Sequence, residues 1–179
     1  MTKELYRNKF KELRKKIDIN LFSTKIVDYL INSDIYKQSK NIMIYMPLRY
    51  EYNLIPITER SKDKLYYIPK CIDGNINICS YNKEIDLKPS NLGVLEPYQI
   101  NKFQDPKIID LICIPCICCD MKKNRIGFGK GYYDRFLPKL KKECIKIIIA
   151  SSLQVVDCLP IDVYDIQSDL ILTENGFIK

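Results

Sequence analysis

Histidine and tryptophan are both absent from this sequence of 179 residues. Histidine is the side chain that most often serves as a general base near neutral pH, and it is also the commonest neutral metal ligand. Any catalysis must therefore use carboxylates, lysine, arginine, tyrosine, cysteine or a bound hard metal ion. The absence of tryptophan accompanies an abundance of isoleucine, lysine, asparagine and tyrosine, which indicates a compositional bias rather than a function.

Long apolar runs are also missing. No segment approaches the roughly 18 continuous apolar residues that a membrane-spanning helix needs. The N-terminal sequence MTKELYR is charged from its third position and leads into no apolar stretch, so it does not resemble a secretory signal. We expect no membrane partner and a cytoplasmic location, or an organelle reached with a leader outside this sequence.

Eight cysteines invite a zinc interpretation, because four of them form the cluster Cys113-x-x-Cys116-x-Cys118-Cys119. The residues around Cys113 are continuously apolar, however, which predicts a buried strand whose alternate side chains face opposite ways. The other cysteines supply no second C-x-x-C pair, which structural zinc sites usually have. We therefore expect reduced thiols that behave as small hydrophobic side chains.

The net charge of +7 is compatible with a nucleic acid, an acidic membrane surface or a polyanionic small molecule as the partner. The lysines are spread along the whole chain, and no block of basic residues has interleaved aromatic residues of the kind that track a nucleic-acid strand. The pattern favours a solvated basic surface with one concentrated phosphate site. A basic nucleic-acid-binding or interaction protein is the alternative.

Strand and helix patterns alternate along the chain and predict a single domain over residues 1–179. Strands separated by helical patterns form βαβ units, so we expect a three-layer α/β/α domain with a mostly parallel, Rossmann-like sheet. Pro138 should kink the last helix or end it early. Strands are expected at residues 41–46, 64–69, 76–79, 108–115, 146–150 and 169–173. Helices are expected at residues 3–16, from about residue 23 onward, at 57–62 and at 132–142. Residues 89–97 are expected to form a loop.

Glycine is scarce, yet three of the six glycines stand at alternate positions in residues 124–135, NRIGFGKGYYDR. Alternate glycines allow positive φ angles and let backbone N–H groups approach an anion. Arg125, Lys130 and Arg135 add positive charge suited to phosphate, and Asp134 could hold a phosphate-bound Mg²⁺. The stretch fits neither a Walker A loop nor a dinucleotide fingerprint. It predicts a metal–nucleotide site, with a solvated tight turn as the alternative.

Two further features are candidates for ligand contacts. Basic residues share one face of the first expected helix, which either contacts an anion or is a solvated surface: Lys3, Arg7, Lys11 and Arg14. Glu51 follows the strand at residues 41–46, and ligands collect beyond the carboxyl ends of strands in open α/β sheets. The alternative role for Glu51 is a favourable charge near the start of the helix at residues 57–62.

With these motifs in view, the sequence resembles the 5-formyltetrahydrofolate cyclo-ligase family, also called the methenyltetrahydrofolate synthetases. The resemblance covers nearly the whole chain. It rests most specifically on residues 124–135 and on the ending P-x-x-x-x-D-x-x-x-D at residues 160–169. It is supported by Lys3-x-x-x-Arg7, the strand into Pro47 with Glu51 after it, Ile68-Pro69-Lys70, Glu96-Pro97 and residues 110–115.

The resemblance implies an ATP- and Mg²⁺-dependent ring closure that converts 5-formyltetrahydrofolate to 5,10-methenyltetrahydrofolate and releases ADP and phosphate. In the implied scheme, the formyl oxygen attacks the γ-phosphate to give an imidate phosphate, and N10 of the folate then displaces phosphate from the activated carbon. Phosphoryl transfer depends more on positioning and charge neutralisation than on a strong base. Such chemistry suits a chain without histidine.

Motif by motif, the resemblance also implies roles for individual residues. Arg125 and Lys130 are the implied catalytic residues, and Asp134 and Asp165 are the implied Mg²⁺ ligands. The implied ATP contacts are Lys3, Arg7, Arg125, Gly127, Phe128, Gly129, Lys130, Gly131, Tyr132 and Tyr133. The implied folate contacts are Met46, Glu51, Phe128, Gly129 and Tyr132, with the Glu51 carboxylate pairing with pterin N–H groups.

The sequence departs from the family pattern at a few positions. Cys116 and Cys119 stand in a loop that usually has glycine and an aromatic residue, and Leu92 stands where an aromatic residue sometimes precedes Glu-Pro. We expect these departures to change folate contacts and not phosphate contacts. The expected partner is the small-molecule folate, whose glutamate tail the basic surface could attract, and the expected assembly state is a monomer. A sugar-phosphate or CoA enzyme of similar fold is a further alternative.

Overall fold

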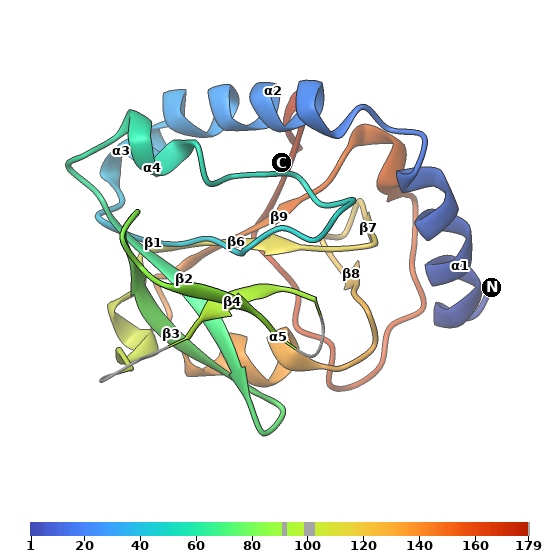
Figure 1. The fold of residues 1–179 in the computed structure, drawn as a ribbon. Helices are drawn as coiled ribbons and strands as arrows, with labels where there is room; N and C mark the ends of the chain where they lie inside the picture. The colour runs from blue at the N-terminus through green and yellow to red at the C-terminus, as the bar shows by residue number, and fades with distance from the viewer. Residues whose placement is uncertain (91–92, 99–102, 179) are drawn as a thin grey trace.

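The computed structural model describes residues 1–90, 93–98 and 103–178, and a seven-stranded sheet forms its centre (Figure 1). The strand order is β12-β11-β9-β6-β1-β2-β3. The inner pairings are all parallel, and β3 and β12 add antiparallel edges, so the predicted mostly parallel sheet is confirmed. The strands are β1 (Asn41–Met43), β2 (Leu65–Ile72), β3 (Asn75–Tyr81), β6 (Leu111–Pro115), β9 (Ile145–Ile149), β11 (Leu170–Thr173) and β12 (Gly176–Ile178).

Helices cover both faces of this sheet, which confirms the three-layer prediction. Successive strand side chains face opposite ways, so Ile42 contributes to the cluster under α2 whereas Met43 contributes to the cluster above α5. Figure 1 shows α2 along one face of the sheet and α5 against the other. The first face carries α2 (Ile19–Asn32), α3 (Asp34–Gln38) and α4 (Ile57–Arg60), and the second carries α5 (Tyr132–Phe136) and a 3-10 turn (Leu137–Lys139).

The first helix, α1 (Lys3–Arg14), packs on a second, smaller sheet rather than on the large one. Thr2 caps α1 by accepting a hydrogen bond from the N–H of Leu5. Phe10 is 3% exposed and packs with Ile117 and Ile126. The small sheet has the order β10-β7-β8 and consists of β7 (Cys118–Asp120), β8 (Arg125–Ile126) and β10 (Val155–Val156).

Several local expectations need correction. The second helix begins at Ile19 and not near Ser23, because Asp18 caps it by accepting a hydrogen bond from the N–H of Leu21. The stretch expected as a loop at residues 89–97 instead contributes to a two-stranded antiparallel sheet of β4 (Leu87–Pro89) and β5 (Leu95–Pro97). Prolines at the strand ends disguise it in the sequence, although an edge position tolerates them. The last helix ends early, as expected, because α5 stops at Phe136 and a 3-10 turn containing Pro138 follows it.

The clustered cysteines point into separate parts of the hydrophobic core. Cys113 packs with the α2 face of the sheet, Cys118 packs with Phe10, and Cys116 and Cys119 share a third cluster with Ile148. All eight thiols are free. Within residues 1–90, 93–98 and 103–178, no three cysteine or acidic side chains come together in a way that could hold a metal ion.

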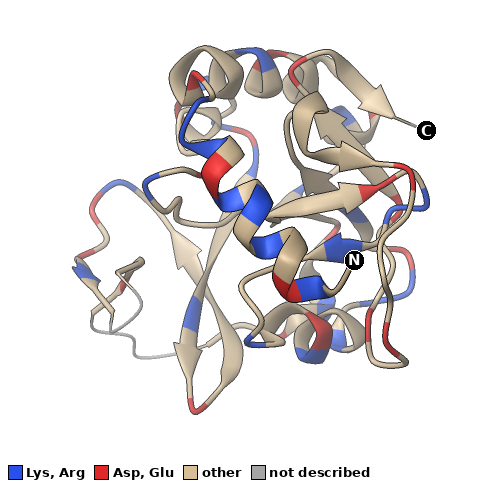
Figure 2. Cartoon of the chain, turned by 90° about the vertical axis from the view of Figure 1, so that its right-hand side faces the viewer, with Lys and Arg blue, Asp and Glu red and all other residues tan. Residues whose placement is uncertain are grey.

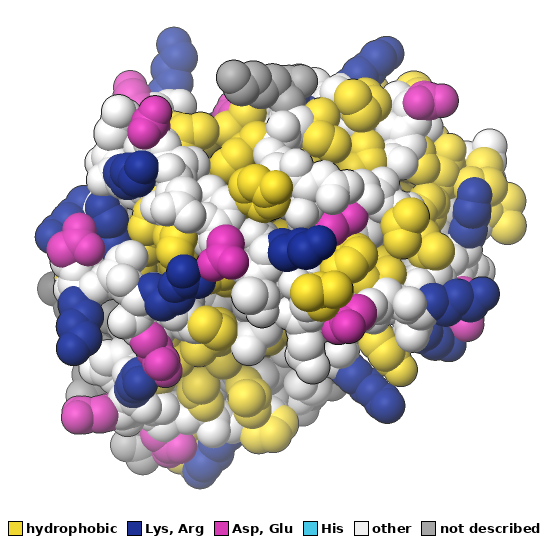
Figure 3. Space-filling model, turned by 90° about the horizontal axis from the view of Figure 1, so that it is seen from above, with side chains coloured by type: hydrophobic (Ala, Val, Ile, Leu, Met, Phe, Trp, Pro, Cys, Tyr) yellow, Lys and Arg dark blue, Asp and Glu magenta, His cyan; other side chains and the backbone are white. Residues whose placement is uncertain are grey.

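The surface shows mixed charge where it can be seen. On the face seen in Figure 3, basic and acidic side chains are interspersed with apolar ones. Among the described residues, no helix has both the length and the apolar character that a membrane crossing requires.

Candidate functional site

A cavity of about 440 Å³ opens beyond the carboxyl ends of β1 and β6. Tyr45 and Met46 follow β1, and Pro115 ends β6. The two strands are neighbours, but the chain continues from β1 to β2 on one side and places β6 on the other. Open α/β sheets bind ligands at such a switch point. The remaining walls come from α1, the β2–β3 hairpin, β5 and residues 125–134.

Residues 127–131 form one wall, and two of its three glycines, Gly129 and Gly131, have positive φ angles and lie close to arginine side chains. The φ angle is +90° at Gly129 and +65° at Gly131, a region that favours glycine. A Cβ atom at Gly129 would lie 3.2 Å from the guanidinium carbon of Arg7, and one at Gly131 would lie 2.8 Å from a nitrogen of Arg135. The Arg7 Nε also donates a hydrogen bond of 3.0 Å to the Gly127 carbonyl oxygen. At Gly129 and Gly131, both the backbone conformation and the nearby arginine side chain favour glycine.

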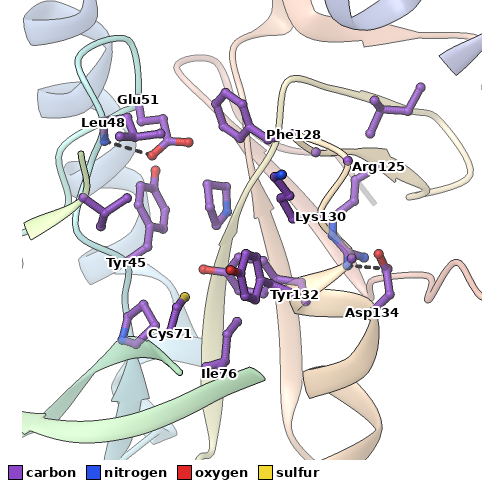
Figure 4. Close-up of a pocket in the computed structure, with 18 of the residues that line it drawn as sticks. Tyr45, Leu48, Glu51, Cys71, Ile76, Arg125, Phe128, Lys130, Tyr132 and Asp134 are labelled. Atoms are coloured by element: carbon purple, nitrogen blue, oxygen red, sulfur yellow. Dashed lines mark hydrogen bonds and ion pairs between the residues drawn. The ribbon is translucent and has the colours of Figure 1, made fainter. Parts of the chain in front are cut away.

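Two basic side chains of this wall differ in how they are held. The Arg125 side chain is only 6% exposed, and it donates hydrogen bonds to Asp134 Oδ1 at 2.7 Å and to the Ile166 carbonyl oxygen at 2.6 Å. The Lys130 side chain instead extends toward the cavity, as Figure 4 shows. In the part of the chain that the structure describes, its ammonium group has no ion-pair partner. Arg125 is therefore fixed, and Lys130 is available.

Both predicted metal ligands line the cavity, and each is paired with a cation. Asp134 accepts from Arg125, and Asp165 accepts from Lys3 Nζ at 2.5 Å. Lys3 also contacts Asp162 at 2.7 Å. Burial lowers the pKa of Lys3, but the hydrogen bonds to the two aspartates outweigh it and leave the pKa raised. Each of the two predicted metal ligands therefore already has a cationic partner before any ligand is present.

The opposite end of the cavity contains Glu51, which is 6% exposed. Its Oε2 accepts a hydrogen bond of 3.0 Å from the Leu48 N–H, and its Oε1 lies 3.9 Å from Arg14 Nη2. Burial raises the pKa of this carboxyl, and the contacts with Leu48 and Arg14 offset only part of the effect. Figure 4 shows the Tyr45 hydroxyl below Glu51. Burial raises the pKa of both Tyr45 and Tyr133, and the negative charge of Glu51 raises it further. Both hydroxyl groups therefore keep their protons.

The structure brings together every residue for which the resemblance implied a contact. All of them line the one cavity: Lys3, Arg7, Met46, Glu51, Arg125, Gly127, Phe128, Gly129, Lys130, Gly131, Tyr132, Tyr133, Asp134 and Asp165. Glu51 lies in a turn beside the cavity and not at the start of α4, so its alternative role as a helix charge is excluded. Lys11 and Arg14 share the basic face of α1 but do not line this cavity.

Other lining residues were not assigned from the sequence. Tyr45 and Leu48 flank the predicted strand end, and Cys71 and Glu96 come from β2 and β5. Glu96 is 8% exposed, and burial together with this carboxylate raises the pKa of the Cys71 thiol to about 12. The Glu96-Pro97 motif was the only feature of the sequence that could have pointed to Glu96.

The expected effect of the sequence departures on folate contacts is corrected for two of the three positions. Cys116 and Cys119 are 4% and 0% exposed and pack with Ile148, outside the cavity lining. Leu92 lies outside the described residues.

Comparison with known proteins decides the family. The model of the 5-formyltetrahydrofolate cyclo-ligase family matches residues 2–174. The chain belongs to this family. A 5-formyltetrahydrofolate cyclo-ligase of Mycoplasma genitalium is 29% identical over an alignment 175 positions long, which covers 92% of this chain and 93% of that protein.

Solved structures of two 5,10-methenyltetrahydrofolate synthetases are similar along nearly the whole cyclo-ligase chain. The NMR structure of the Aquifex aeolicus protein is 30% identical, with a TM-score of 0.85 and coverage of 99% of this chain and 92% of that one. The structure from Mycoplasma pneumoniae is 26% identical, with a TM-score of 0.77 and coverage of 97% and 99%. The predicted α/β fold and the predicted enzyme class, a ligase, are confirmed.

Proposed function

We propose that this cyclo-ligase family member closes the ring of 5-formyltetrahydrofolate to give 5,10-methenyltetrahydrofolate, using ATP and Mg²⁺ and releasing ADP and phosphate. The observation that carries the proposal is the opposite character of the two ends of one cavity. Basic side chains and a glycine loop form one end, which we call the phosphate end: Lys3, Arg7, residues 125–131, Asp134 and Asp165. Buried Glu51, with Tyr45, Met46 and Leu48, forms the other, the folate end.

The phosphate end has the charge and backbone geometry to bind the phosphates of a nucleoside triphosphate. Three side chains place positive charge on one side of the cavity. They are Arg7, whose guanidinium lies over Gly129, Lys130, whose ammonium group is exposed, and Arg125, whose guanidinium is fixed. Gly129 and Gly131 have positive φ angles, a backbone conformation that can turn successive N–H groups toward an anion. Gly127, Phe128, Tyr132 and Tyr133 complete this wall. Charge developing on a transferred phosphoryl group is best stabilised by such preorganised cations, and we assign Arg125 and Lys130 to that task.

The folate end fits a pterin ring. The Glu51 carboxylate is buried, so two adjacent N–H donors of a pterin can offset its desolvation in a way that solvent cannot. Met46 and Leu48 provide apolar contact for the ring, and Phe128 with Tyr132 stands between the two ends. In the proposed binding mode, the formyl group at N5 points toward Lys130 and the glycine loop.

Asp134 and Asp165 are the residues that would hold Mg²⁺. Carboxylate oxygens are the ligands that Mg²⁺ prefers, and it usually binds through one or two of them together with phosphates of the substrate. When bound, the ion would neutralise phosphate charge. Because Lys3 and Arg125 pair with these carboxylates before ligand binding, we propose a partner exchange in which Lys3 turns to the phosphates and releases Asp165, while Arg125 stays in place beside Asp134.

The proposed reaction has two bond-forming steps. The formyl oxygen attacks the γ-phosphorus as the bond to ADP breaks, and the folate N10 then attacks the formyl carbon. The carbon–oxygen bond breaks, N10 loses its proton, and the former formyl oxygen leaves within the phosphate. Lys130 and Arg125 neutralise the transferred phosphoryl group, while Glu51 keeps the pterin oriented. No histidine is needed for either step.

The proposal is tested with purified protein, 5-formyltetrahydrofolate, ATP and Mg²⁺. We expect the absorbance of methenyltetrahydrofolate in the near ultraviolet to rise with time, and we expect no rise without ATP or Mg²⁺. With ¹⁸O in the formyl group, the label should appear in the released phosphate. An active preparation that leaves the label elsewhere would disprove the phosphorylated intermediate, and a well-folded protein that gives no product would disprove the function.

A further inference from the structure

Glu96 is a second buried carboxylate in the wall of the cavity. It stands in the middle of β5 and is 8% exposed, compared with 6% for Glu51. The proposed reaction gives Glu51 a ligand and gives Glu96 no task. Because a buried carboxylate is unfavourable unless it is paired, Glu96 needs a partner that the ligand-free protein does not supply.

Two lysines lie near Glu96 in the fold, and other groups occupy both. Lys88 is opposite Glu96 in the β4–β5 pairing, but its ammonium group lies 3.2 Å from the centre of the Tyr98 ring. Lys70, on β2, donates hydrogen bonds to the carbonyl oxygens of Pro97 at 2.6 Å and of Tyr98 at 3.3 Å. In the part of the chain that the structure describes, Glu96 therefore has no ion-pair partner.

The β2–β3 hairpin, which packs against β5, offers little charge of its own. Figure 2 shows this hairpin as nearly uncharged, in contrast to the basic positions repeated along α1. Burial, followed by the charge of Glu96, raises the pKa of the Cys71 thiol to about 12. Burial also raises the pKa of Cys79 to about 11, with Lys70 lowering it and Glu96 raising it. Both thiols keep their protons near neutral pH, so the carboxylate is the proton acceptor of this wall.

The wall that contains Glu96 faces the middle of the cavity. Figure 4 shows Cys71, the neighbour of Glu96, between Tyr45 of the folate end and Tyr132 beside the glycine loop. A reduced folate whose pyrimidine N–H groups pair with Glu51 keeps two further N–H donors near the ring, at N8 and N10. N10 is the one beside the formyl group at N5. This part of the ligand must lie in the middle of the cavity for the formyl oxygen to reach the γ-phosphate.

We propose that Glu96 is the catalytic residue that accepts the N10 proton during ring closure. The inference rests on the proposed function, which forms the bond between N10 and the formyl carbon. As that bond forms, the N10 proton passes to a carboxylate oxygen of Glu96. The carbon–oxygen bond then breaks, and its electron pair leaves with the phosphate. A nitrogen that has shared its lone pair is strongly acidic, so a carboxylate suffices as the base, and Glu96 afterwards returns the proton to solvent.

Transient kinetics separate the two bond-forming steps. The parent and Glu96→Gln are mixed with 5-formyltetrahydrofolate, ATP and Mg²⁺, and the first turnover is followed by rapid quench for ADP and by stopped-flow absorbance for methenyltetrahydrofolate. Glutamine keeps the shape of the side chain but does not take a proton. We expect ADP to form at the parental rate and methenyltetrahydrofolate to form about 10²-fold more slowly.

The matched control is Glu84→Gln, at an exposed position near β4 that does not line the cavity. It should equal the parent in both measurements. If Glu96→Gln slowed both products alike, or neither of them, Glu96 would not be the proton acceptor of ring closure.

Chemical rescue tests the proton acceptor in a second variant. Glu96→Ala removes the carboxylate and leaves room for formate, a small carboxylate that can take the proton in its place. We expect formate to raise the rate of methenyltetrahydrofolate formation by roughly tenfold, and chloride at the same ionic strength to leave it unchanged. Equal effects of formate and chloride would assign Glu96 a structural role instead.

A binding comparison separates this inference from the proposed function. The probes are 5-formyltetrahydrofolate and its 10-deaza analogue, in which CH₂ replaces N10–H. We expect the parent to bind the first about tenfold more tightly, through a charged hydrogen bond to Glu96, and Glu96→Ala to bind both alike. The same preference in both proteins would overturn the contact. A parent protein that forms neither ADP nor methenyltetrahydrofolate would overturn the proposed reaction, and this comparison would still decide whether Glu96 contacts N10.

Discussion

The two ends of the first cavity differ in how their charges are balanced. At the phosphate end, Lys3 and Arg125 already hold Asp165 and Asp134 at 2.5 and 2.7 Å. At the folate end, the buried carboxylate of Glu51 has one backbone donor and a cation at 3.9 Å. A ligand at the phosphate end must therefore replace existing ion pairs, whereas a ligand at the folate end supplies a partner that is missing.

The two ends therefore contribute differently to the stability of the ligand-free protein. Balanced ion pairs join the N-terminus to the segment near residue 165, so the phosphate end helps to hold the fold together. An incompletely paired, buried carboxylate costs stability, and such a residue is retained for binding rather than for folding. Substitutions at the two ends should consequently separate activity from stability in different ways.

The largest effect is expected from Lys130→Ala at the phosphate end. Lys130 is exposed and has no ion-pair partner within the described ranges, so the free energy of unfolding should stay near that of the parent. The rate constant kcat should fall by about 10²- to 10³-fold, because one preorganised charge opposite the transferred phosphoryl group is lost. Steady-state kinetics and thermal unfolding check both parts, with Lys122→Ala as the matched control. A variant with near-parental kcat would remove Lys130 from the catalytic assignment.

Arg125→Ala tests the same task in a residue that also supports the structure. We expect kcat to fall by a similar factor, about 10²- to 10³-fold. Unlike Lys130→Ala, this variant also loses the hydrogen bonds to Asp134 and to the Ile166 carbonyl, so its unfolding midpoint should fall too. If kinetics and stability changed equally in the two variants, the contrast between a fixed and an available cation would be wrong.

The next effect is expected from Glu51→Gln at the folate end. Losing a charged hydrogen-bond partner of the pterin should weaken folate binding by about 10- to 100-fold. The free energy of unfolding should increase, because burial raises the pKa of Glu51 and makes its ionised form unfavourable in the folded state. Titration calorimetry with 5-formyltetrahydrofolate measures the first change, with the exposed Glu143→Gln as control.

The pH dependence of this variant gives a sharper check. A carboxyl whose folded pKa is raised contributes stability that is fully present below its ordinary pKa and is lost as the pH rises through the folded pKa. The glutamine variant does not titrate, so its gain in thermal midpoint over the parent should be larger at pH 8 than at pH 5. A gain of equal size at both pH values would mean that folding does not raise the pKa of Glu51.

The smallest effect is expected from Lys3→Ala, which tests the partner exchange. Removing the cation frees Asp165, so the affinity for Mg²⁺ alone should rise by a few-fold, while the affinity for ATP should fall by about fivefold. Titrations with Mn²⁺ as a spectroscopic substitute and with a nonhydrolysable ATP analogue measure the two changes. If both affinities fell, Lys3 would act only as a structural tie between α1 and the segment near residue 165.

The phosphate end was largely predictable from the sequence, for a local reason. Glycine is rare in this chain, so three glycines among Arg125, Lys130 and Asp134 carry information within a dozen residues. The strands β6 and β9 were also predictable, because each contains a continuous apolar run, residues 111–114 and 147–149, whose side chains are buried on both faces of the sheet. Such signals need no knowledge of which segments meet.

The rest of the site could not be predicted because it depends on contacts between distant segments. Arg14 was expected on a solvated or anion-binding face, yet it is 3% exposed because the turn at Tyr50 covers it. Glu96 and Cys71 meet only because β5 returns to the β2–β3 hairpin. The two-residue strand β8 and the three-residue strand β7 are too short to show a period of their own.

The contact of Lys3 with Asp162 and Asp165 spans 159 and 162 positions of the sequence. During synthesis, chains emerge from the N-terminus first, at roughly 5–20 residues per second. Helix α1 is thus made well before its acidic partners. A nascent chain can build the β1–β2–β3 side of the sheet early, yet it cannot complete the phosphate end until Asp162 and Asp165 have been added.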